Sequence, residues 1–269
     1  MPYKGYQKDL FCSAYSETGE LFQFAIKLKN IPGAIAEVAN VFFSKNINLL
    51  HGFHTVCSDP TEVVWGFFAD LKDSKDKIED IVKEISKLDS TLEVKFSRPI
   101  IDGLIVDEIH FPIMVLNERS IVLKVSTFSE CFKRLYEKFG SGACFILYEM
   151  GKAAGENRVK RMNEKYDLNK LTVLKVILAE RAAKGWGISR IETFDEEKSE
   201  ATITVQELFE CLSFQGRSKE AKSQFFRGYL AGVLSQLFSK PILVIESECI
   251  AKGDESCKFT GQIRSKEFT

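Results

Sequence analysis

One stretch near the end of the sequence combines residue types that bind metals or undergo redox chemistry. Residues 246–259 read ESECIAKGDESCKF, with Glu246, Cys249 and Cys257 arranged around a turn that contains Gly253. If the turn is centred on this glycine, the two cysteines face each other across an antiparallel hairpin, with Cβ atoms about 4.5 to 5.5 Å apart. That spacing allows both thiolates to bind one zinc ion through bonds of about 2.3 Å, and it is also close to the spacing of a disulfide.

The sequence leaves three states of this hairpin open, namely a bound metal, two free thiols and a disulfide. The seven cysteines are an odd number scattered along the chain, so they do not form a disulfide framework, and a reducing compartment favours a metal over a disulfide. On a regular strand Glu246 and Cys249 point to opposite faces, so joint coordination requires a bulge or a strand end. No general base with an orienting partner lies nearby in the sequence, which favours a structural metal over a catalytic one.

The composition is that of a globular protein without an electrostatic bias. The sequence has 37 Lys and Arg against 38 Asp and Glu, a balance that gives no field to attract nucleic acid or an anionic membrane. The N-terminus lacks an apolar targeting region, and no apolar run approaches the roughly 18 residues of a membrane span. We therefore expect a cytoplasmic protein of about two domains, with no membrane partner and no direct nucleic-acid partner.

The first part of the chain predicts a ferredoxin-like α+β unit. Its apolar residues alternate in the segments expected as strands and recur at helical spacing in the segments between them. Pro32 and Gly33 end the first strand and open the first helix. The expected order is a strand over 21–28, a helix after Gly33, strands over 47–56 and 62–71, a helix over 73–88 and a strand over 91–98. This βαββαβ order gives one antiparallel sheet with two helices on one face.

The run NIPGAIAEVANVFFSKNINL resembles the opening of an ACT domain, a regulatory module whose first strand is followed by D-x-P-G-x-L and a helix. This chain has Asn30 where the acid is usual and keeps the Pro-Gly pair. The resemblance covers residues 20–98 and implies an amino-acid-like ligand, contacted by Asn30, Gly33 and Ala34 against a strand of a partner domain in a homodimer. Free N–H groups at the helix N-terminus suit a carboxylate. The alternative is that Asn30 only caps the helix and the domain serves for dimerisation.

The rest of the chain predicts a second α+β domain after a linker with one or two short strands over 99–120. We expect helices packed on an antiparallel sheet, from the following segments: helices over 128–139, 140–162, 168–185 and 218–238, strands over 188–195 and 200–211, and a hairpin over 241–263. Gly151, Ala154 and Gly155 are small residues on the second of these helices and predict the close approach of a neighbour.

Four segments, GSGACFILYEMGKAAG, KGWGISRIE, FRGYLAGVLSQLF and ESECIAKGDESCKF, resemble the 4-vinyl-reductase-type domain, abbreviated 4VR. The resemblance spans 121–263 and implies a small-molecule-binding domain of the type that senses aromatic compounds. It also implies a structural zinc held by Glu246, Cys249 and Cys257, with a further cysteine five residues before a Gly-Tyr pair. That position is Ser223 here, so the fourth ligand is absent from its expected place.

Water or Cys211, from ELFECLSF, could complete the metal shell. The three histidines His51, His54 and His110 lie in other expected elements, so we do not assign them to the site.

We therefore predict a ligand-responsive regulatory protein that senses an amino-acid-like ligand, a small apolar or aromatic molecule, or both. The 22 phenylalanines are enough to line an apolar pocket as well as fill a core. The candidate pocket residues are Phe139, Phe145, Trp186, Phe209, Phe225 and Tyr229. Output has to pass through oligomerisation or a partner protein, because the sequence shows no helix-turn-helix and no GxxxxGK[ST] motif.

Two other functions stay open. The chain is an adaptor or scaffold protein if its domains serve only for dimerisation. A reductase or reductase accessory subunit is less consistent with the sequence, because no GxGxxG follows a strand and no nucleotide cofactor is indicated.

Overall fold

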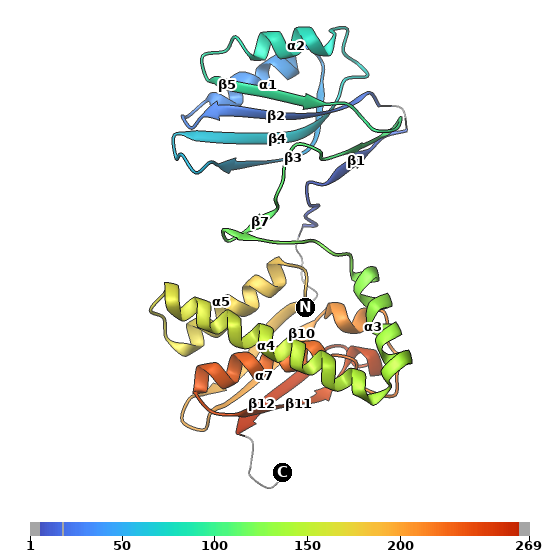
Figure 1. Cartoon of the computed structure of the whole chain (residues 1–269), viewed down its shortest axis with the longest axis vertical. Coiled ribbons are helices and arrows are strands. Elements are labelled where there is room, and N and C mark those ends of the chain that lie inside the picture. Colours follow the sequence, from blue (N-terminus) through green and yellow to red (C-terminus); the bar gives the residue numbers. More distant parts are fainter. Residues whose placement is uncertain (1–5, 18, 264–269) are drawn as a thin grey trace. The chain divides into compact units, whose positions relative to one another are not determined.

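The chain forms two compact units, and each is described by itself. The computed structural model describes residues 6–17 and 19–263. The first unit ends at Ile121 and the second begins at Val122 (Figure 1). In the described ranges, no helix is both long and apolar enough to cross a membrane.

The first unit contains a four-stranded antiparallel sheet in the order β3-β4-β2-β5, with two helices on one face (Figure 1). Its elements are β2 (Leu21–Lys29), α1 (Ala34–Ser44), β3 (Asn48–Val56), β4 (Glu62–Asp70), α2 (Ile78–Ile85) and β5 (Thr91–Ser97). The core between sheet and helices includes the mutually packed rings of Phe24, Phe42 and Phe67, whose centroids lie 5.0 to 5.4 Å apart. The predicted βαββαβ order is confirmed, although α2 begins at Ile78 and is shorter than expected.

A further layer covers the opposite face of this sheet. β1 (Ser13–Tyr15) pairs with β6 (Leu104–Val106), and the fully buried side chain of Gln23 hydrogen-bonds to Asp107 beyond β6. β6 therefore belongs to the first unit rather than to a free linker. The remaining short strands, β7 (Met114–Val115) and β8 (Glu118–Arg119), pair only with each other.

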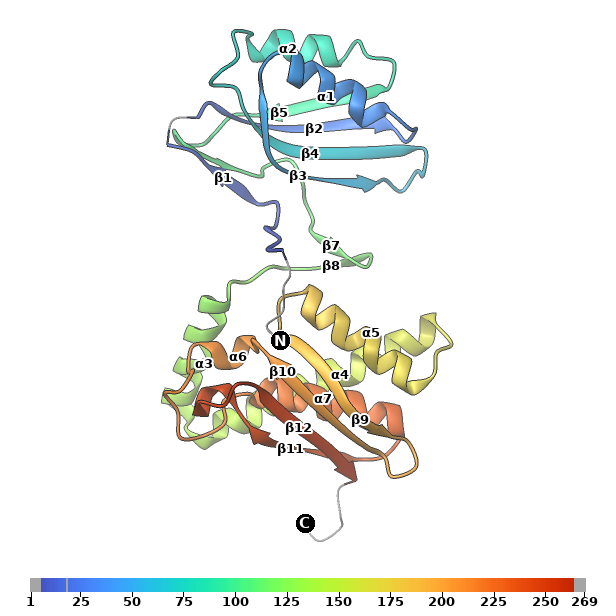
Figure 2. The same cartoon turned by 180° about the vertical axis from the view of Figure 1, so that it is seen from behind.

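The second unit packs helices on a four-stranded antiparallel sheet in the order β11-β12-β10-β9. Its elements are α3 (Val125–Phe139), α4 (Ser141–Lys165), α5 (Lys170–Ala183), β9 (Ile188–Asp195), β10 (Glu200–Gln206), α6 (Phe209–Leu212), α7 (Gln224–Phe238), β11 (Ile242–Glu248), the 3-10 turn η1 (Ile250–Lys252) and β12 (Cys257–Ile263). Figure 2 shows the sheet in front of α7 and α4. The α+β class predicted from the sequence is confirmed.

Helices α4 and α7 cross at a contact made by glycines. A Cβ at Gly151 or Gly155 of α4 would lie closer than 3.0 Å to the backbone of α7, and a Cβ at Gly228 or Gly232 would lie equally close to the backbone of α4. The predicted close approach at Gly151 and Gly155 is therefore confirmed. Ala154 is exposed and takes no part in the crossing.

Two segments of the second unit differ from the sequence prediction. The strand expected over 200–211 ends at Gln206, because Glu207 has a positive φ of 52° and the next residues turn into α6. Helix α7 begins at Gln224 rather than at 218. The preceding segment is held in a loop by backbone hydrogen bonds to the η1 turn, including Ser218 N–H to the Ala251 carbonyl at 3.0 Å.

Candidate metal site and aromatic cluster

Three buried cysteines meet where α6 approaches the β11–β12 hairpin. The Sγ atoms of Cys211 and Cys249 are 3.6 Å apart, those of Cys211 and Cys257 are 3.7 Å apart, and those of Cys249 and Cys257 are 4.0 Å apart. A carboxylate oxygen of Glu246 joins them, so that four ligand atoms lie within 4.8 Å of one another. All seven cysteines are free thiols in the structure.

Irregularities in the hairpin bring Glu246 and Cys249 to the same side. The pairing register of β11 with β12 shifts between Glu246 and Glu248, and β11 ends at Glu248. Cys249 thus follows the strand end and opens the η1 turn, where its N–H donates to a carboxylate oxygen of Asp254 at 2.7 Å. The requirement for a bulge or a strand end is met by both.

The geometry of the four ligands fits a tetrahedral zinc ion. Tetrahedral bonds of about 2.3 Å place sulfur atoms about 3.8 Å apart, and the three observed separations of 3.6 to 4.0 Å bracket that value. Oε1 of Glu246 is buried and has no hydrogen-bond partner among the described residues, which leaves it free to bind a cation. Ser223 donates its hydroxyl hydrogen to Oε2 and so orients this carboxylate.

Cys211 therefore takes the place that Ser223 leaves open. Three thiolates and one carboxylate form a closed set of four ligands, which is the arrangement of structural zinc sites and leaves no position for substrate. The disagreement between the motif and the ligand count at Ser223 is thus removed by a cysteine from α6.

The electrostatics of the cluster indicate negative charge that needs a counter-ion. Hydrogen bonds from Cys211 and Cys257 lower the pKa of Cys249, and the bond to Cys249 raises the pKa of Cys211, so one thiolate is shared between them. Burial raises the pKa of Glu246 to about 8. A divalent cation would stabilise the charged forms of all these groups.

Glu210 lies beside the cluster and connects α6 to the N-terminus of α7. Its side chain is 2% exposed, and its two oxygens each accept a backbone N–H at 2.9 Å, from Phe225 and Phe226. Burial raises its pKa to about 8, although these two hydrogen bonds favour the charged form. The helix N-terminus supplies a complementary positive dipole.

The raised pKa of Glu210 predicts a pH dependence of stability in metal-free protein. A carboxyl raised from 4.5 to about 8 contributes stability that is complete below pH 4.5 and is lost as pH rises through 8. We expect the free energy of unfolding to fall with pH across this window, and Glu210→Gln to reduce the slope by about 1.4 kcal/mol per pH unit. Urea unfolding of chelator-treated protein at pH 5 to 8 measures this slope. Glu220→Gln, at a side chain that is 81% exposed, should leave the slope unchanged, and equal slopes in the Glu210 variant and the wild type would contradict the prediction.

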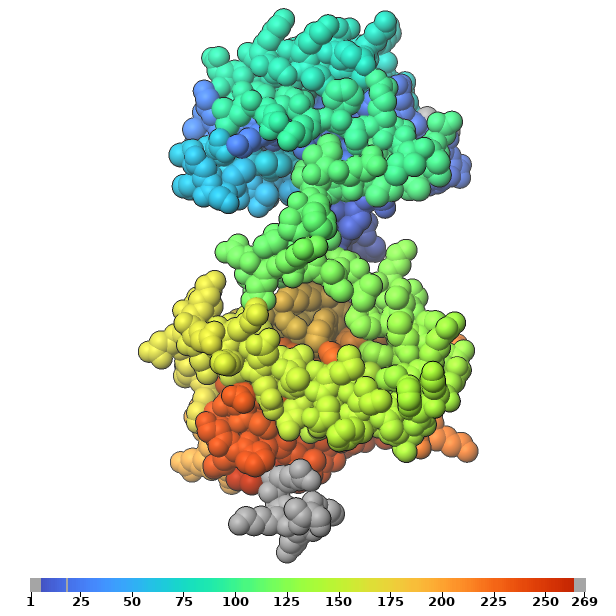
Figure 3. Space-filling model, in the orientation of Figure 1, coloured from blue at the N-terminus to red at the C-terminus, as the bar shows by residue number. Residues whose placement is uncertain are grey.

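An aromatic cluster lies on the other side of α6. The ring of Trp186 is 5.6 Å from Phe209, 5.5 Å from Phe225 and 5.2 Å from Tyr229, measured between centroids. Trp186 and Phe225 are half-buried, whereas Phe209 and Tyr229 are buried. Figure 3 shows a hollow in the surface of this unit between the yellow helix α5 and the green helix α3, with its floor in the gold and orange colours of the segment from β9 onward. We name these four residues the aromatic cluster.

The structure brings together four of the six pocket residues proposed from the sequence. Phe139 and Phe145 do not join them, because their side chains are 51% and 68% exposed. Two residues that the sequence analysis did not select lie at these sites, Glu210 and Arg181. Arg181 carried a signal, since it continues the buried face formed by Val173, Leu174, Ile177 and Leu178 of α5, where an apolar residue is expected.

The three residues proposed for the N-terminal ligand lie in one loop between β2 and α1. The Asn30 side-chain amide donates to the Pro60 carbonyl at 2.8 Å, so it does not cap α1. Gly33 is exposed with φ at 91°, and Ala34 is buried at the first position of the helix. The cap position thus has no side-chain hydrogen bond.

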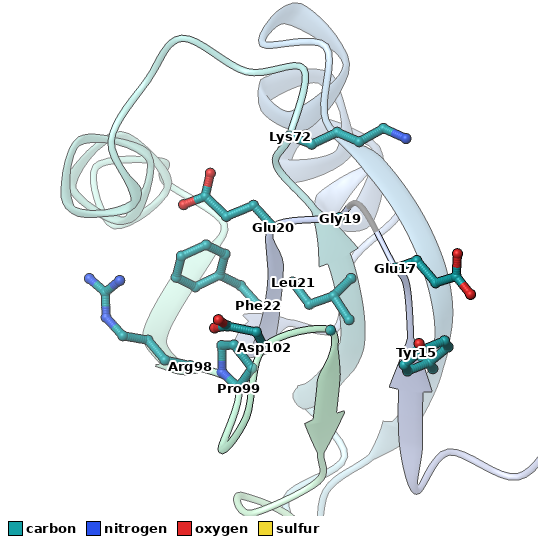
Figure 4. Close-up of a pocket in the computed structure, with 11 residues that line it drawn as sticks. Tyr15, Glu17, Gly19, Glu20, Leu21, Phe22, Lys72, Arg98, Pro99 and Asp102 are labelled. Atoms are coloured by element: carbon teal, nitrogen blue, oxygen red, sulfur yellow. The ribbon is translucent and has the colours of Figure 1, made fainter.

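A pocket of about 740 Å³ lies at the other end of β2, beside Leu21 (Figure 4). Charged side chains of both signs surround Leu21 and Phe22, among them Glu20, Asp102 and Arg98. Arg98 is paired with Glu79 at 2.8 Å and lies 5.3 Å from the Phe22 ring centroid, so it is not a free cation. This pocket is separate from the loop of Asn30.

Comparison with known proteins identifies a domain within the second unit. Residues 202–263 match the family model of the 4VR domain, so the second unit carries a 4VR domain. The match includes all four clustered metal ligands and three of the four residues of the aromatic cluster. The chain is also 27% identical over 129 residues to an uncharacterized protein of Methanocaldococcus jannaschii, which covers 48% of this chain and 70% of that protein.

Three solved structures show weaker similarity. The phenol-responsive sensory domain of the transcription activator PoxR, solved with phenol, is 20% identical with a TM-score of 0.48, over 54% of this chain and 77% of that one. A vinyl-4-reductase family protein of Methanocaldococcus jannaschii is 20% identical with a TM-score of 0.39, over 54% and 85%. The ACT domain of GTP pyrophosphokinase from Chlorobium tepidum is 13% identical with a TM-score of 0.25, over 30% and 100%.

Proposed function

We propose that this chain is a ligand-responsive regulatory protein whose second unit binds a small apolar or aromatic molecule at the aromatic cluster. The observation that carries the proposal is the hydroxyl of Tyr229, which is buried among these rings without a hydrogen-bond partner in the described part of the chain. A buried polar atom left unpaired is unfavourable, and a bound molecule with a polar group relieves it. The half-buried rings of Trp186 and Phe225 give such a molecule a surface to stack on.

The chemistry of Tyr229 supports a donor role toward the ligand. Burial raises the pKa of this hydroxyl to about 12, so it stays protonated at neutral pH. The 4VR match, which includes Phe209, Phe225 and Tyr229, supports placing the ligand here.

A structural zinc bound by Cys211, Glu246, Cys249 and Cys257 belongs to the same proposal. Three of the ligands come from the hairpin and Cys211 comes from α6, which also carries Phe209 of the aromatic cluster. The metal would fix α6 to the hairpin and so hold one wall of the ligand site in place. Its role is to stabilise the site and not to take part in a reaction.

The first unit is proposed to bind an amino-acid-like carboxylate at the loop of Asn30 and Gly33, as an ACT domain would. Support comes from the βαββαβ topology and from the α1 N-terminus, where Asn30 is committed to Pro60 and does not cap the helix. Regulation would be transmitted through a homodimer or a partner protein.

Thermal unfolding of the full chain with panels of small aromatic compounds and of amino acids tests both sites. A ligand at 100 times its dissociation constant should add about 2.7 kcal/mol of stability, or roughly 5 to 10 °C in the midpoint. Phe225→Ala should remove most of the shift caused by the aromatic ligand, whereas Phe139→Ala, at an exposed ring, should retain it. Each variant is compared with its own unliganded midpoint. If no compound of either panel shifts the wild type, the protein is an adaptor and the proposal is wrong.

A further inference from the structure

Arg181 is a buried cation at the edge of the aromatic cluster. The residue is 8% exposed, and its guanidinium carbon lies 4.6 Å from the ring centroid of Trp186 and 5.3 Å from that of Tyr229. Its Nε is buried and has no hydrogen-bond partner within the described ranges. The aromatic faces hold the guanidinium in place, while one of its directional donors is unused.

The charges around Arg181 do not balance. Arg158 holds Glu180 through two hydrogen bonds, one of them from Nε to Oε2 at 2.8 Å. Arg181 approaches the same carboxylate only at 3.6 Å, which is too long for a hydrogen bond. Two cations therefore share one carboxylate in a group whose side chains are 10% to 18% exposed. A buried charge that lacks a full partner is strongly unfavourable, so this arrangement is suited to an additional anion.

We propose that the ligand of the second unit is an apolar or aromatic molecule with a carboxylate or equivalent anionic group, which pairs with Arg181. The inference rests on the proposed function of the aromatic cluster and adds the charge of its ligand. The apolar body stacks on Trp186 and Phe225, and the anionic group accepts hydrogen bonds from Arg181 Nε and from the Tyr229 hydroxyl. Both donors lack another partner among the described residues, and they belong to side chains that contact each other.

A purely structural role for Arg181 makes a different prediction. Arg181 lies in the last turn of α5, where a cation interacts favourably with the helix dipole. Such a role contributes to stability but gives no preference between a charged ligand and a neutral one of the same shape. Ligand preference therefore separates the two roles.

The experiment compares pairs of ligands that differ only in charge, benzoate with benzamide and 2-naphthoate with 2-naphthamide. Dissociation constants are measured by calorimetry on the full-length protein at constant ionic strength. In the wild type we expect each carboxylate to bind about tenfold to a hundredfold more tightly than its amide. Arg181→Gln should bring the ratio close to one while amide binding persists. Arg134→Gln, at a side chain of α3 that is 78% exposed, should keep the wild-type ratio.

Each outcome decides between the claims. If the amides bind the wild type as tightly as the carboxylates, or if Arg181→Gln keeps the preference, the anionic ligand is wrong while the aromatic site stands. If neither member of any pair binds folded wild-type protein, the proposed function fails and the inference fails with it. If Arg181→Gln does not fold, the wild-type ratio decides, together with Arg181→Lys, which keeps the charge but should lose most of the preference because it lacks Nε.

Discussion

The Cys211→Ser variant is expected to lose the zinc that the wild-type protein binds at about one equivalent per chain. The three Sγ separations of 3.6 to 4.0 Å fit one tetrahedral ion, and a neutral serine hydroxyl is a poor zinc ligand. If free zinc exceeds its dissociation constant a thousandfold, losing the site removes about 4 kcal/mol from the free energy of unfolding. Elemental analysis of the protein as isolated and its thermal unfolding measure the two effects.

Two matched variants sharpen this prediction. Cys131→Ser replaces an exposed cysteine and should retain both zinc and stability. Ser223→Ala removes only the hydrogen bond to Glu246 and should retain zinc with weaker affinity. Wild-type protein without zinc, or a Cys211 variant with a full equivalent, would show that α6 contributes no ligand.

The Gly228→Ala variant is expected to lose about 3 kcal/mol or more of unfolding free energy. The added methyl would lie closer than 3.0 Å to the backbone of Tyr148 in α4, and a helix backbone cannot move aside as a flexible side chain can. The helices would have to separate along a contact that also includes Gly151 and Gly155, so the core loses packing on both. The gain of about 1 kcal/mol in helix propensity offsets only part of this cost.

Urea unfolding of this variant is best compared with that of Gly142→Ala in α4. A Cβ at Gly142 meets only the Phe139 Cβ, at 3.8 Å, which is ordinary van der Waals contact. This control should be as stable as the wild type or up to about 1 kcal/mol more stable. A Gly228 variant with wild-type stability would mean that the two helices do not cross at the observed distance.

The local patterns of the sequence were sufficient for the fold of the first unit. Alternating and helical spacings of apolar residues depend on neighbours in the chain, and these gave the βαββαβ order that the structure shows. The covering layer was missed because β1 pairs with β6, about 90 residues away. Short strands with few apolar residues carry little periodicity of their own.

The candidate sites depended more strongly on long-range structure. The spacing of Glu246, Cys249 and Cys257 within one hairpin was readable from the motif. Cys211 could be named only as one of two alternatives, because its position depends on the positive φ at Glu207 that ends β10 and starts α6. Similarly, helical spacing alone did not indicate whether Phe145 faces the core or solvent, and the structure leaves it 68% exposed.

The central claim, that an aromatic ligand binds at the aromatic cluster, can be tested with the two tryptophans of the chain. Trp186 belongs to the cluster, whereas Trp65 lies in β4 of the first unit. Protein labelled with 5-fluorotryptophan gives one ¹⁹F signal for each residue, and Trp65→Phe assigns them. On titration with the ligand of the largest thermal shift, we predict a saturable change in the Trp186 signal and a constant Trp65 signal. A Trp186 signal that stays constant through saturation of the thermal shift would contradict the account.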